Sequence, residues 1–418
     1  MHIRRGCLTA TAGRHGVPRT RREDASPHRR AVRRSDEGST TMSLRTTKVV
    51  AAFAGAALLV GGLAACSQER AAETPEGDGA AAAEGGLIGI AMPTKSLERW
   101  NKDGAHLEEL LQEAGYETTL QYADNQVDQQ ITQLQNMINQ DPEVLVVASI
   151  DGTALGPVLA QAKEKDIAVI AYDRLINGTD DVDYYATFDN YEVGKLQGEF
   201  IVEQLGLETE AGPFNLEPFA GSPDDNNAKF FFSGAWDVLK PYVDEGKLVT
   251  PSGKAPKSND EWTSIGIQGW GSDDAQSEME NRLNSFYAGG TKVDVVLSPN
   301  DSLALGIQQA LEGAGYTPGT DWPLITGQDA DKANVQNMLA DKQSMSVWKD
   351  TRTLGDQVAK MVDQIVTGED VEVNDEETYD NGNKVVPTYL LPPQVVTKDD
   401  VESVLVESGF YKASDLGL

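Results

Sequence analysis

Residues 144–173 read VLVVASIDGTALGPVLAQAKEKDIAVIAYD, and this stretch decides the fold class. It opens with VLVVAS and closes with IAVIAYD, two short runs that are apolar at successive positions rather than at alternate ones. Unbroken apolar runs are typical of parallel strands whose two faces are both covered. The segment LGPVLAQAKEKD between them has a helical pattern, so the stretch predicts a strand–helix–strand unit.

The same alternation extends in both directions from this unit. Towards the N-terminus, LIGIAMP at 87–93 precedes a helical pattern that ends in HLEELLQEAG, and TTLQYA at 118–123 precedes a Gln-rich helical stretch. Towards the C-terminus, apolar runs recur in VDVVLSP (293–299), PLITGQ (323–328) and MSVWKD (345–350). Strands and helices that alternate over this length predict an α/β protein built from doubly wound domains.

Charged and amide side chains stand where the predicted strands end. In doubly wound folds, ligands bind beyond the carboxyl ends of the strands. The residues that follow the strands are Asp173-Arg174, Asn300-Asp301, Gln328-Asp329 and Lys349-Asp350, and Arg99-Trp100 come soon after the first strand. We therefore expect a ligand site where these side chains gather.

This mixture of side chains suits a polyhydroxylated ligand, because sugar hydroxyls both donate and accept hydrogen bonds. The candidates are acceptors (Asp173 and Asp329), donors (Arg99, Arg174 and Lys349) and amides that do both (Asn227 and Asn300). The faces of Trp100 and Trp270 suit the apolar C–H face of a pyranose ring. Each position also has a structural explanation: an Asp after a strand can cap a helix, Asp173-Arg174 can form a local ion pair, and Trp is often a core residue.

The N-terminal region is typical of a bacterial export signal with a lipid attachment site. Residues 42–65 begin with the basic segment MSLRTTK and continue with an apolar run of signal-peptide length. LAAC at 63–66 resembles a lipobox, so we predict that Cys66 is lipidated and anchors the protein to the outer face of the cell membrane. An uncleaved signal anchor or a buried apolar helix is the alternative, although the run is short for a membrane span.

Two further N-terminal segments are expected to lie outside the fold. Residues 1–41 are rich in Arg and precede Met42, a natural start, so we interpret them as an untranslated extension. A twin-Arg export signal is the alternative. Residues 66–86 are rich in Ala, Gly and Glu, which predicts a disordered tether.

Composition excludes several classes of function. The formal net charge is -31, and an acidic surface repels nucleic acid. The two cysteines, Cys7 and Cys66, are too few for a disulfide framework or a Cys-based zinc site. Neither a D-x-D-x-D-G calcium loop nor a dinucleotide-binding Gly motif in a strand–turn–helix context is present, so we expect no metal and no cofactor. We also expect a monomer.

From Ile88 onwards the chain resembles the type I periplasmic sugar-binding proteins of ABC importers, especially the ChvE-like multiple-sugar-binding and the xylose-binding members. The segments that carry this resemblance are IGIAMPTKSLERW, QYADNQVDQQITQLQNMI, VLVVASIDGT, IAVIAYDRLI, YYATFDNYEVGKLQG, GSPDDNNAKFFFSGAWDVLKPYV, SPNDSLALGI, TGQDAD and NDEETYDNGNKVVPTYLLPP. Several of them are long and specific to the family.

The resemblance implies two Rossmann-like lobes joined by a three-strand hinge. The chain would cross between the lobes near residues 193, 351 and 385. Residues 87–192 and 352–385 would form the N-terminal lobe, and residues 193–351 and 386–418 the C-terminal lobe. An aldose such as glucose, galactose or xylose would bind between the lobes and favour their closed arrangement, which the permease of an ABC importer would recognise. The resemblance thus implies a binding protein and not an enzyme.

The family's sugar contacts can be assigned by position in the shared segments. They are Arg99 and Trp100 in ERW, Asp173 and Arg174 in YDR, Asn227 in DNN, Trp270 before SDDA, Asn300 in PND, Asp329 in GQDA, and Lys349 in VWKD.

Three other functions are alternatives. A glycosidase could use Asp173 and Asp329 as its carboxylate pair, but the neighbouring Arg and Lys residues would keep both ionised, which suits binding better than acid catalysis. The mature chain also has a single His, His106, and neither a G-x-S-x-G nor a zinc motif. A sugar-responsive repressor would need a helix-turn-helix domain where this chain has its lipobox and tether. A sensor that docks on a membrane receptor kinase would share the same binding site, and the sequence leaves this partner open beside the permease.

Overall fold

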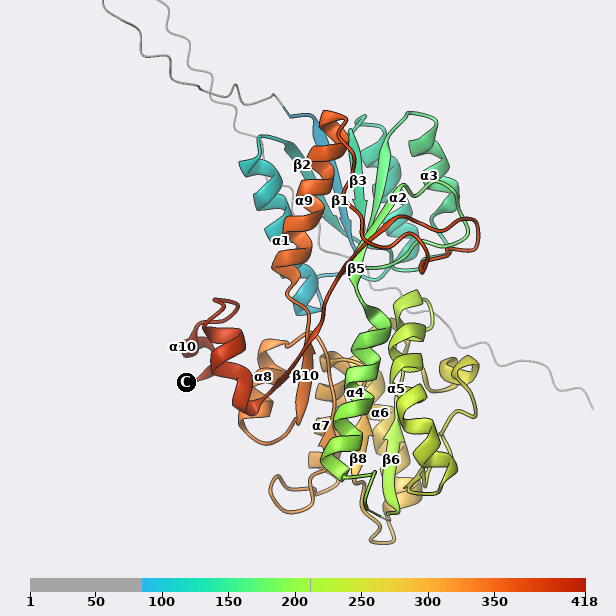
Figure 1. Ribbon diagram of the computed structural model, residues 1–418, viewed down its shortest axis with the longest axis vertical. Coiled ribbons are helices and arrows are strands. Elements are labelled where there is room, and N and C mark those ends of the chain that lie inside the picture. Colours follow the sequence, from blue (N-terminus) through green and yellow to red (C-terminus); the bar gives the residue numbers. More distant parts are fainter. Residues whose placement is uncertain (1–84, 211) are drawn as a thin grey trace, which may run out of the picture. The chain divides into compact units, whose positions relative to one another are not determined.

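The computed structural model describes residues 85–210 and 212–418. The predicted extension, the signal peptide, Cys66 and all but the end of the tether lie outside these residues. The described residues belong to one compact unit, which contains two lobes, each with its own parallel sheet (Figure 1).

The first lobe has a six-stranded sheet in the order β11-β5-β4-β3-β1-β2, in which every neighbouring pair is parallel. Its strands are β1 (Leu87–Met92), β2 (Glu117–Tyr122), β3 (Val144–Val147), β4 (Ala168–Tyr172), β5 (Tyr184–Phe188) and β11 (Thr388–Leu391). The strand–helix–strand prediction for residues 144–173 is therefore confirmed, with β3 and β4 adjacent and parallel.

Helices cover both faces of this sheet, which explains why its strands are continuously apolar. On β3, Val144 and Val146 face the core beneath α1 (Glu98–Glu113) and α9 (Thr351–Thr367), which lie side by side in Figure 1. Leu145 and Val147 face the opposite core beneath α2 (Val127–Ile138) and α3 (Gly156–Lys163). Because successive side chains of a strand point to opposite faces, each position needs an apolar residue.

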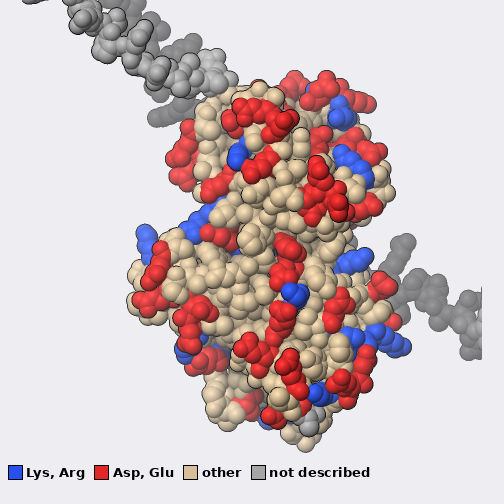
Figure 2. Space-filling view, in the orientation of Figure 1, with Lys and Arg blue, Asp and Glu red and all other residues tan. Residues whose placement is uncertain are grey.

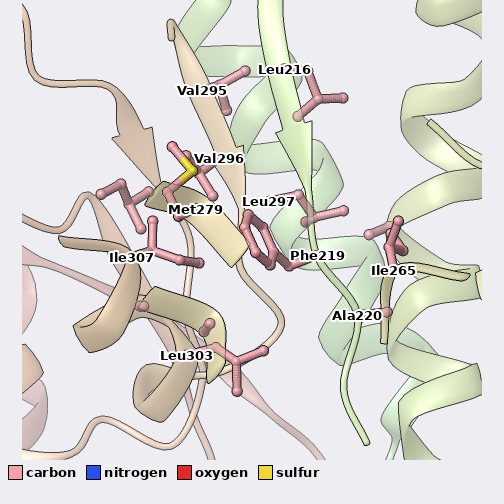
Figure 3. Packing of buried hydrophobic residues seen from close by; sticks show 14 of the residues in the cluster. Leu216, Phe219, Ala220, Ile265, Met279, Val295, Val296, Leu297, Leu303 and Ile307 are labelled. Carbon is pink, nitrogen blue, oxygen red and sulfur yellow. The ribbon is translucent and has the colours of Figure 1, made fainter. Parts of the chain in front are cut away.

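The second lobe has a smaller parallel sheet in the order β7-β6-β8-β9. Its strands are β6 (Phe214–Pro218), β7 (Leu248–Val249), β8 (Val295–Leu297) and β9 (Leu324–Ile325), and its helices are α4 (Asn190–Leu205), α5 (Asn226–Asp244), α6 (Ser272–Arg282), α7 (Asp301–Gly313), α8 (Lys332–Leu339) and α10 (Ala413–Leu416). Figure 3 shows part of the core between sheet and helices, where Val296 of β8 lies near Met279 and Ile307 of the helices.

The MSVWKD run behaves differently from the other apolar runs. It forms β10 (Met345–Trp348), which pairs with β12 (Gln394–Thr397) in antiparallel register. Its parallel contact is limited to a single bridge between Val347 and Gln328. The run is therefore a strand, as the apolar pattern predicts, with one parallel bridge on one edge and an antiparallel ladder with the returning C-terminal segment on the other.

Three crossings join the lobes. The chain leaves the first sheet after Phe188 and enters α4, returns between Trp348 and Thr351, and crosses a last time between Leu391 and Gln394. The third crossing had been expected near residue 385. It lies later because β11 extends the first sheet by pairing with β5, so residues 388–391 belong to the first lobe.

Close packing of α4 against α5 fixes the start of the second lobe. A Cβ added to Gly194 would lie 1.8 Å from the main-chain oxygen of Phe231, and one added to Gly234 would lie 2.0 Å from that of Tyr191. Only glycine allows the two backbones to approach this closely. The positions of α5 side chains near its N-terminus therefore depend on these glycines.

Acidic side chains are spread over both lobes on the face drawn in Figure 2, interspersed with Lys and Arg. Such a surface repels a phosphate backbone. Among the helices of the described residues, none combines the length and the apolar character that a membrane span requires.

Candidate ligand-binding site

All nine residues predicted from the sequence line one cavity. They are Arg99, Trp100, Asp173, Arg174, Asn227, Trp270, Asn300, Asp329 and Lys349, and four residues that the sequence analysis did not assign to the site, Leu97, Asp225, Phe231 and Gln328, complete the lining. The first lobe supplies the residues up to Arg174 and the second lobe supplies the residues from Asp225 to Asp329, so the cavity lies between the lobes.

Two of the carboxylates project from the sheet edges in an unusual backbone conformation. Asp173 directly follows β4 with φ of 60°, and Asp329 follows β9 with φ of 94°. Asp is one of the few residues apart from glycine that tolerate positive φ. At Asp173, the main-chain oxygen accepts hydrogen bonds from Tyr185 Oη at 2.8 Å, Thr187 Oγ1 at 3.0 Å and Asn227 Nδ2 at 2.6 Å. These three donors hold the turn in place.

Arg99 is the centre of the ionic network. It lies in the first turn of α1 and is buried. Its Nη2 atom donates to Asp103 Oδ2 at 3.0 Å and to Asp173 Oδ2 at 2.8 Å, and its Nη1 atom lies 3.4 Å from Asp329 Oδ1. Arg99 therefore joins carboxylates of both lobes.

The surrounding charges control the ionisation of Asp173. Burial opposes its charge, but the nearby cations Arg99, Lys349 and Arg174 outweigh that effect and lower the pKa of Asp173 below its ordinary value. Asp173 is thus a fixed anion at neutral pH. A carboxylate held in this way accepts hydrogen bonds and is poorly suited to donate a proton.

A second ionic chain runs across the cavity from Arg174. Its Nε atom lies 3.0 Å from Asp225 Oδ2, and the same oxygen accepts from Trp270 Nε1 at 3.1 Å. Asp225 also caps α5 through the main-chain N–H of Asn227, at 2.9 Å. Burial is the largest influence on the carboxyl of Asp225 and raises its pKa. Asp225 thus positions the guanidinium group of Arg174, the indole of Trp270 and the N-terminus of α5.

The third cation of the cavity comes from the second crossing between the lobes. Lys349 is buried, its Nζ atom lies 3.0 Å from Asp329 Oδ1, and it lies 5.3 Å from the ring centroid of Phe231. Asn300 stands nearby as the cap of α7, where its Oδ1 atom accepts from the N–H of Leu303 at 3.0 Å. Asn300 therefore has a structural role in addition to lining the cavity.

Two indoles supply the apolar surfaces. The guanidinium groups of Arg99 and Arg174 lie 4.6 Å and 5.1 Å from the ring centroid of Trp100. Trp270 packs edge-on against Phe231, with 6.2 Å between ring centroids. Its ring also covers Gly221, where an added Cβ would lie 2.0 Å from the indole. The indole of Trp270 is therefore locked between α5 and the backbone at Gly221.

Three of the four additional lining residues are close in sequence to predicted ones, and one of these, Gln328, is among the strand-end residues where the sequence predicts a ligand site. Leu97 precedes the ERW segment, Asp225 lies two residues before Asn227, and Gln328 precedes Asp329. Phe231 is one of three consecutive Phe residues, and only the helical position in α5 distinguishes the one that faces the cavity. A signal existed for Asp225 and Gln328, since both follow the rule that polar residues at strand ends and helix starts face the ligand edge.

The arrangement is that of a binding site. Three cations (Arg99, Arg174 and Lys349) balance three carboxylates (Asp173, Asp225 and Asp329) around one small cavity. Asp173 and Asp329, the pair considered for glycoside hydrolysis, are both paired with Arg99. Within residues 85–210 and 212–418, no group of three or more His, Cys, Asp or Glu residues is arranged to hold a metal ion.

Comparison with known proteins agrees with the fold. A family described as the periplasmic binding protein domain matches residues 88–370. The chain is 49% identical over 336 residues to the multiple sugar-binding periplasmic receptor ChvE of Rhizobium radiobacter, covering 80% of this chain and 93% of that protein. It is 36% identical over 329 residues to the D-xylose-binding periplasmic protein of Escherichia coli K12, covering 79% of this chain and 92% of that protein.

A solved structure is similar over the same region. It is an ABC transporter solute-binding protein from Clostridium phytofermentans with bound β-D-glucose, with 54% sequence identity and a TM-score of 0.76, and the match covers 79% of this chain and 99% of that chain. These relatives are binding proteins and not enzymes, as expected from the sequence. The chain belongs to the periplasmic binding protein family, with its type I fold.

Proposed function

We propose that this chain is a lipid-anchored, extracytoplasmic solute-binding protein. It holds one aldose monosaccharide, such as glucose, galactose or xylose, in the cavity between its lobes and delivers it to an ABC importer. The single observation that carries this proposal is the cavity itself, in which fixed donors and acceptors from both lobes converge between two indoles.

The cavity chemistry supports a sugar over other small polar ligands. A charged ligand would upset the balance of three cations and three carboxylates, whereas a neutral polyol leaves it intact. Each hydroxyl can donate to a carboxylate such as Asp173 and accept from a cation such as Lys349. The indole faces of Trp100 and Trp270 provide apolar contact for the C–H groups of a sugar ring.

The names of the relatives support the ligand class. One is a receptor for multiple sugars, one binds D-xylose, and one holds β-D-glucose. Residues from both lobes surround the cavity, so a bound sugar would favour the closed arrangement of the lobes. A permease that recognises this closed form would then receive only loaded protein.

Calorimetric titration tests the proposal. The protein from Ser67 to Leu418, which contains the whole compact unit, is titrated with D-glucose, D-galactose, D-xylose and L-arabinose. We expect binding of at least one aldose at micromolar affinity or tighter, and loss of that binding in Asp173→Ala. Folded protein that binds none of the four sugars would refute the assignment.

The lipid anchor and the importer need separate tests. Metabolic labelling with a fatty acid should mark the full-length protein and not Cys66→Ser, and unlabelled wild-type protein would exclude the anchor. For delivery, reconstituted permease and ATPase should hydrolyse ATP faster with the sugar-loaded protein than with the empty one. Equal rates would favour a sensory role over transport.

A further inference from the structure

Three residues that line the cavity have a buried side-chain atom without a protein partner in the described part of the chain. They are Arg99 (Nε), Trp100 (Nε1) and Gln328 (Oε1), and the Gln328 oxygen is the acceptor among them. Gln328 lies between β9 and the binding residue Asp329, lines the cavity, and is 1% exposed. Its Oε1 atom is buried, and no donor among the described residues reaches it. Buried side-chain oxygens in native proteins nearly always have a partner. The missing donor at Gln328 therefore calls for a group that the protein itself does not supply.

Main-chain contacts fix the backbone at Gln328. The main-chain oxygen of Gln328 accepts from the N–H of Asp301 at 3.1 Å, and Gln328 forms a parallel bridge with Val347. On its C-terminal side, the N–H of Asp329 donates to the main-chain oxygen of Val347 at 2.9 Å. The backbone is thus anchored on both sides, so the Cα of Gln328 keeps its place beside the cavity.

The carboxylates of the site are already engaged, which gives the amide a distinct role. Cations of the protein contact Asp173 Oδ2, Asp225 Oδ2 and Asp329 Oδ1. The Oε1 atom of Gln328 is a neutral acceptor that no cation competes for. It can accept from a hydroxyl group and gains nothing from a hydrogen, fluorine or ether oxygen at the same place.

We propose that Gln328 is a specificity-determining residue whose side-chain oxygen accepts a hydrogen bond from one hydroxyl group of the bound sugar. This inference rests on the proposed function of the cavity. It adds a contact from the second lobe, next to Asp329, so it would form in the closed arrangement. It also predicts that one particular hydroxyl is required as a donor.

A double-mutant cycle between protein and sugar tests this contact. Calorimetry compares wild type with Gln328→Met, which keeps the side-chain length and loses the amide, using D-glucose and its monodeoxy analogues; if D-xylose binds more tightly, its deoxy series is used instead. We expect Gln328→Met to bind the parent sugar ~10-fold more weakly, the loss of one hydrogen bond. For one deoxy analogue the two proteins should bind equally, because the hydroxyl partner is already gone.

Further measurements distinguish an accepting amide from a donating one and from a variant that fails to fold. The deoxyfluoro sugar at the same position should behave like the deoxy sugar, and if it keeps the affinity of the parent, the amide donates and the proposal is wrong. Gln328→Glu, which keeps an acceptor, should retain the preference for that hydroxyl, and thermal melting checks that both variants fold. An equal penalty of Gln328→Met for every analogue overturns the inference alone, whereas wild type that binds no aldose overturns the proposed function as well.

Discussion

The Nη1 atom of Arg99, in the first lobe, lies 3.4 Å from Oδ1 of Asp329, in the second. The same carboxylate oxygen lies 3.0 Å from Nζ of Lys349, on the crossing between the lobes. A single carboxylate thus meets one cation from the opposite lobe and one from the hinge. Asp329 therefore lines the cavity and also joins the two lobes through its ion pairs.

Replacing this carboxylate should weaken sugar binding strongly. Asp329→Asn keeps the shape of the side chain but leaves two buried cations with one fewer anion. Removing one partner of a buried charge pair costs about 2 kcal/mol or more, which corresponds to a loss of at least ~30-fold in affinity. Calorimetry with the best-binding aldose measures the loss. Asp128→Asn, at an exposed position of α2, is the matched control and should bind like wild type.

The buried Asp103 should give the free protein a distinctive pH dependence. Burial raises the pKa of Asp103 to about 6, although Arg99 opposes this effect. The pKa in the unfolded chain is lower, so the folded state binds the proton more tightly. The associated stability is fully present below the unfolded pKa and is lost as the pH rises through about 6.

The variant Asp103→Asn isolates this contribution, because it cannot titrate at this position. As the pH falls from 7 to 4, the melting temperature of wild type should improve relative to that of Asp103→Asn. Melting curves without sugar, recorded in parallel for both proteins, cancel the effects of the other carboxylates. A difference that is constant with pH would mean that Asp103 titrates normally.

The glycine contact between α4 and α5 should be sensitive to a single methyl group. Gly194→Ala places a Cβ against the main-chain oxygen of Phe231, so the helices must separate, at a cost of roughly 1–3 kcal/mol. Because Phe231 lines the cavity, affinity should fall together with the melting temperature. Gly313→Ala, in α7 with no atom within 4 Å of the new Cβ, is the control, and it should be neutral or stabilising.

The contacts of Tyr411, which does not line the cavity, should favour the closed arrangement of the lobes. Tyr411, near the C-terminus, accepts a hydrogen bond at its Oη atom from Lys102 Nζ of α1 at 2.7 Å, and the same hydroxyl lies 3.3 Å from Glu98 Oε1. Tyr411→Phe removes both polar contacts between the lobes, together with the hydrogen bond from Tyr411 Oη to the main-chain oxygen of Ala330 at 3.0 Å within the second lobe, and leaves the cavity-lining side chains unchanged. We expect a loss of affinity of a few-fold, and small-angle scattering should show a more open sugar-free protein. Unchanged affinity would mean that these contacts do not favour the closed state.

The sequence predicted the first lobe well because its strands are buried on both faces. Runs such as VLVVAS require apolar residues at every position, and that signal is hard to mistake. It could not locate β11 or β12, since TYLL and QVVT are short and their strand character depends on β5 and β10 as partners. For the same reason the third crossing was placed too early.

The candidate site could be predicted where a residue type and a strand end coincided. Asp173, Asn300 and Asp329 follow this rule, and the structure brings them to one cavity. Phe231 and Leu97 follow no such rule, because an apolar residue that faces a ligand looks in sequence like one that faces the core. Arg174 and Trp270 both contact the carboxylate of Asp225. These contacts depend on the distance between the two lobes, which local sequence does not encode.

Lys349 lies on the segment between β10 and α9 where the chain passes from one lobe to the other, and Asp350 beside it caps α9. A side chain that lines the cavity is therefore carried by a segment that connects the two lobes. Mutations in this segment that alter ligand preference would also alter how readily the protein opens. At this position, sugar selectivity and the ease of lobe opening would therefore change together. This would hold in evolution and in the engineering of a fluorescent sugar reporter.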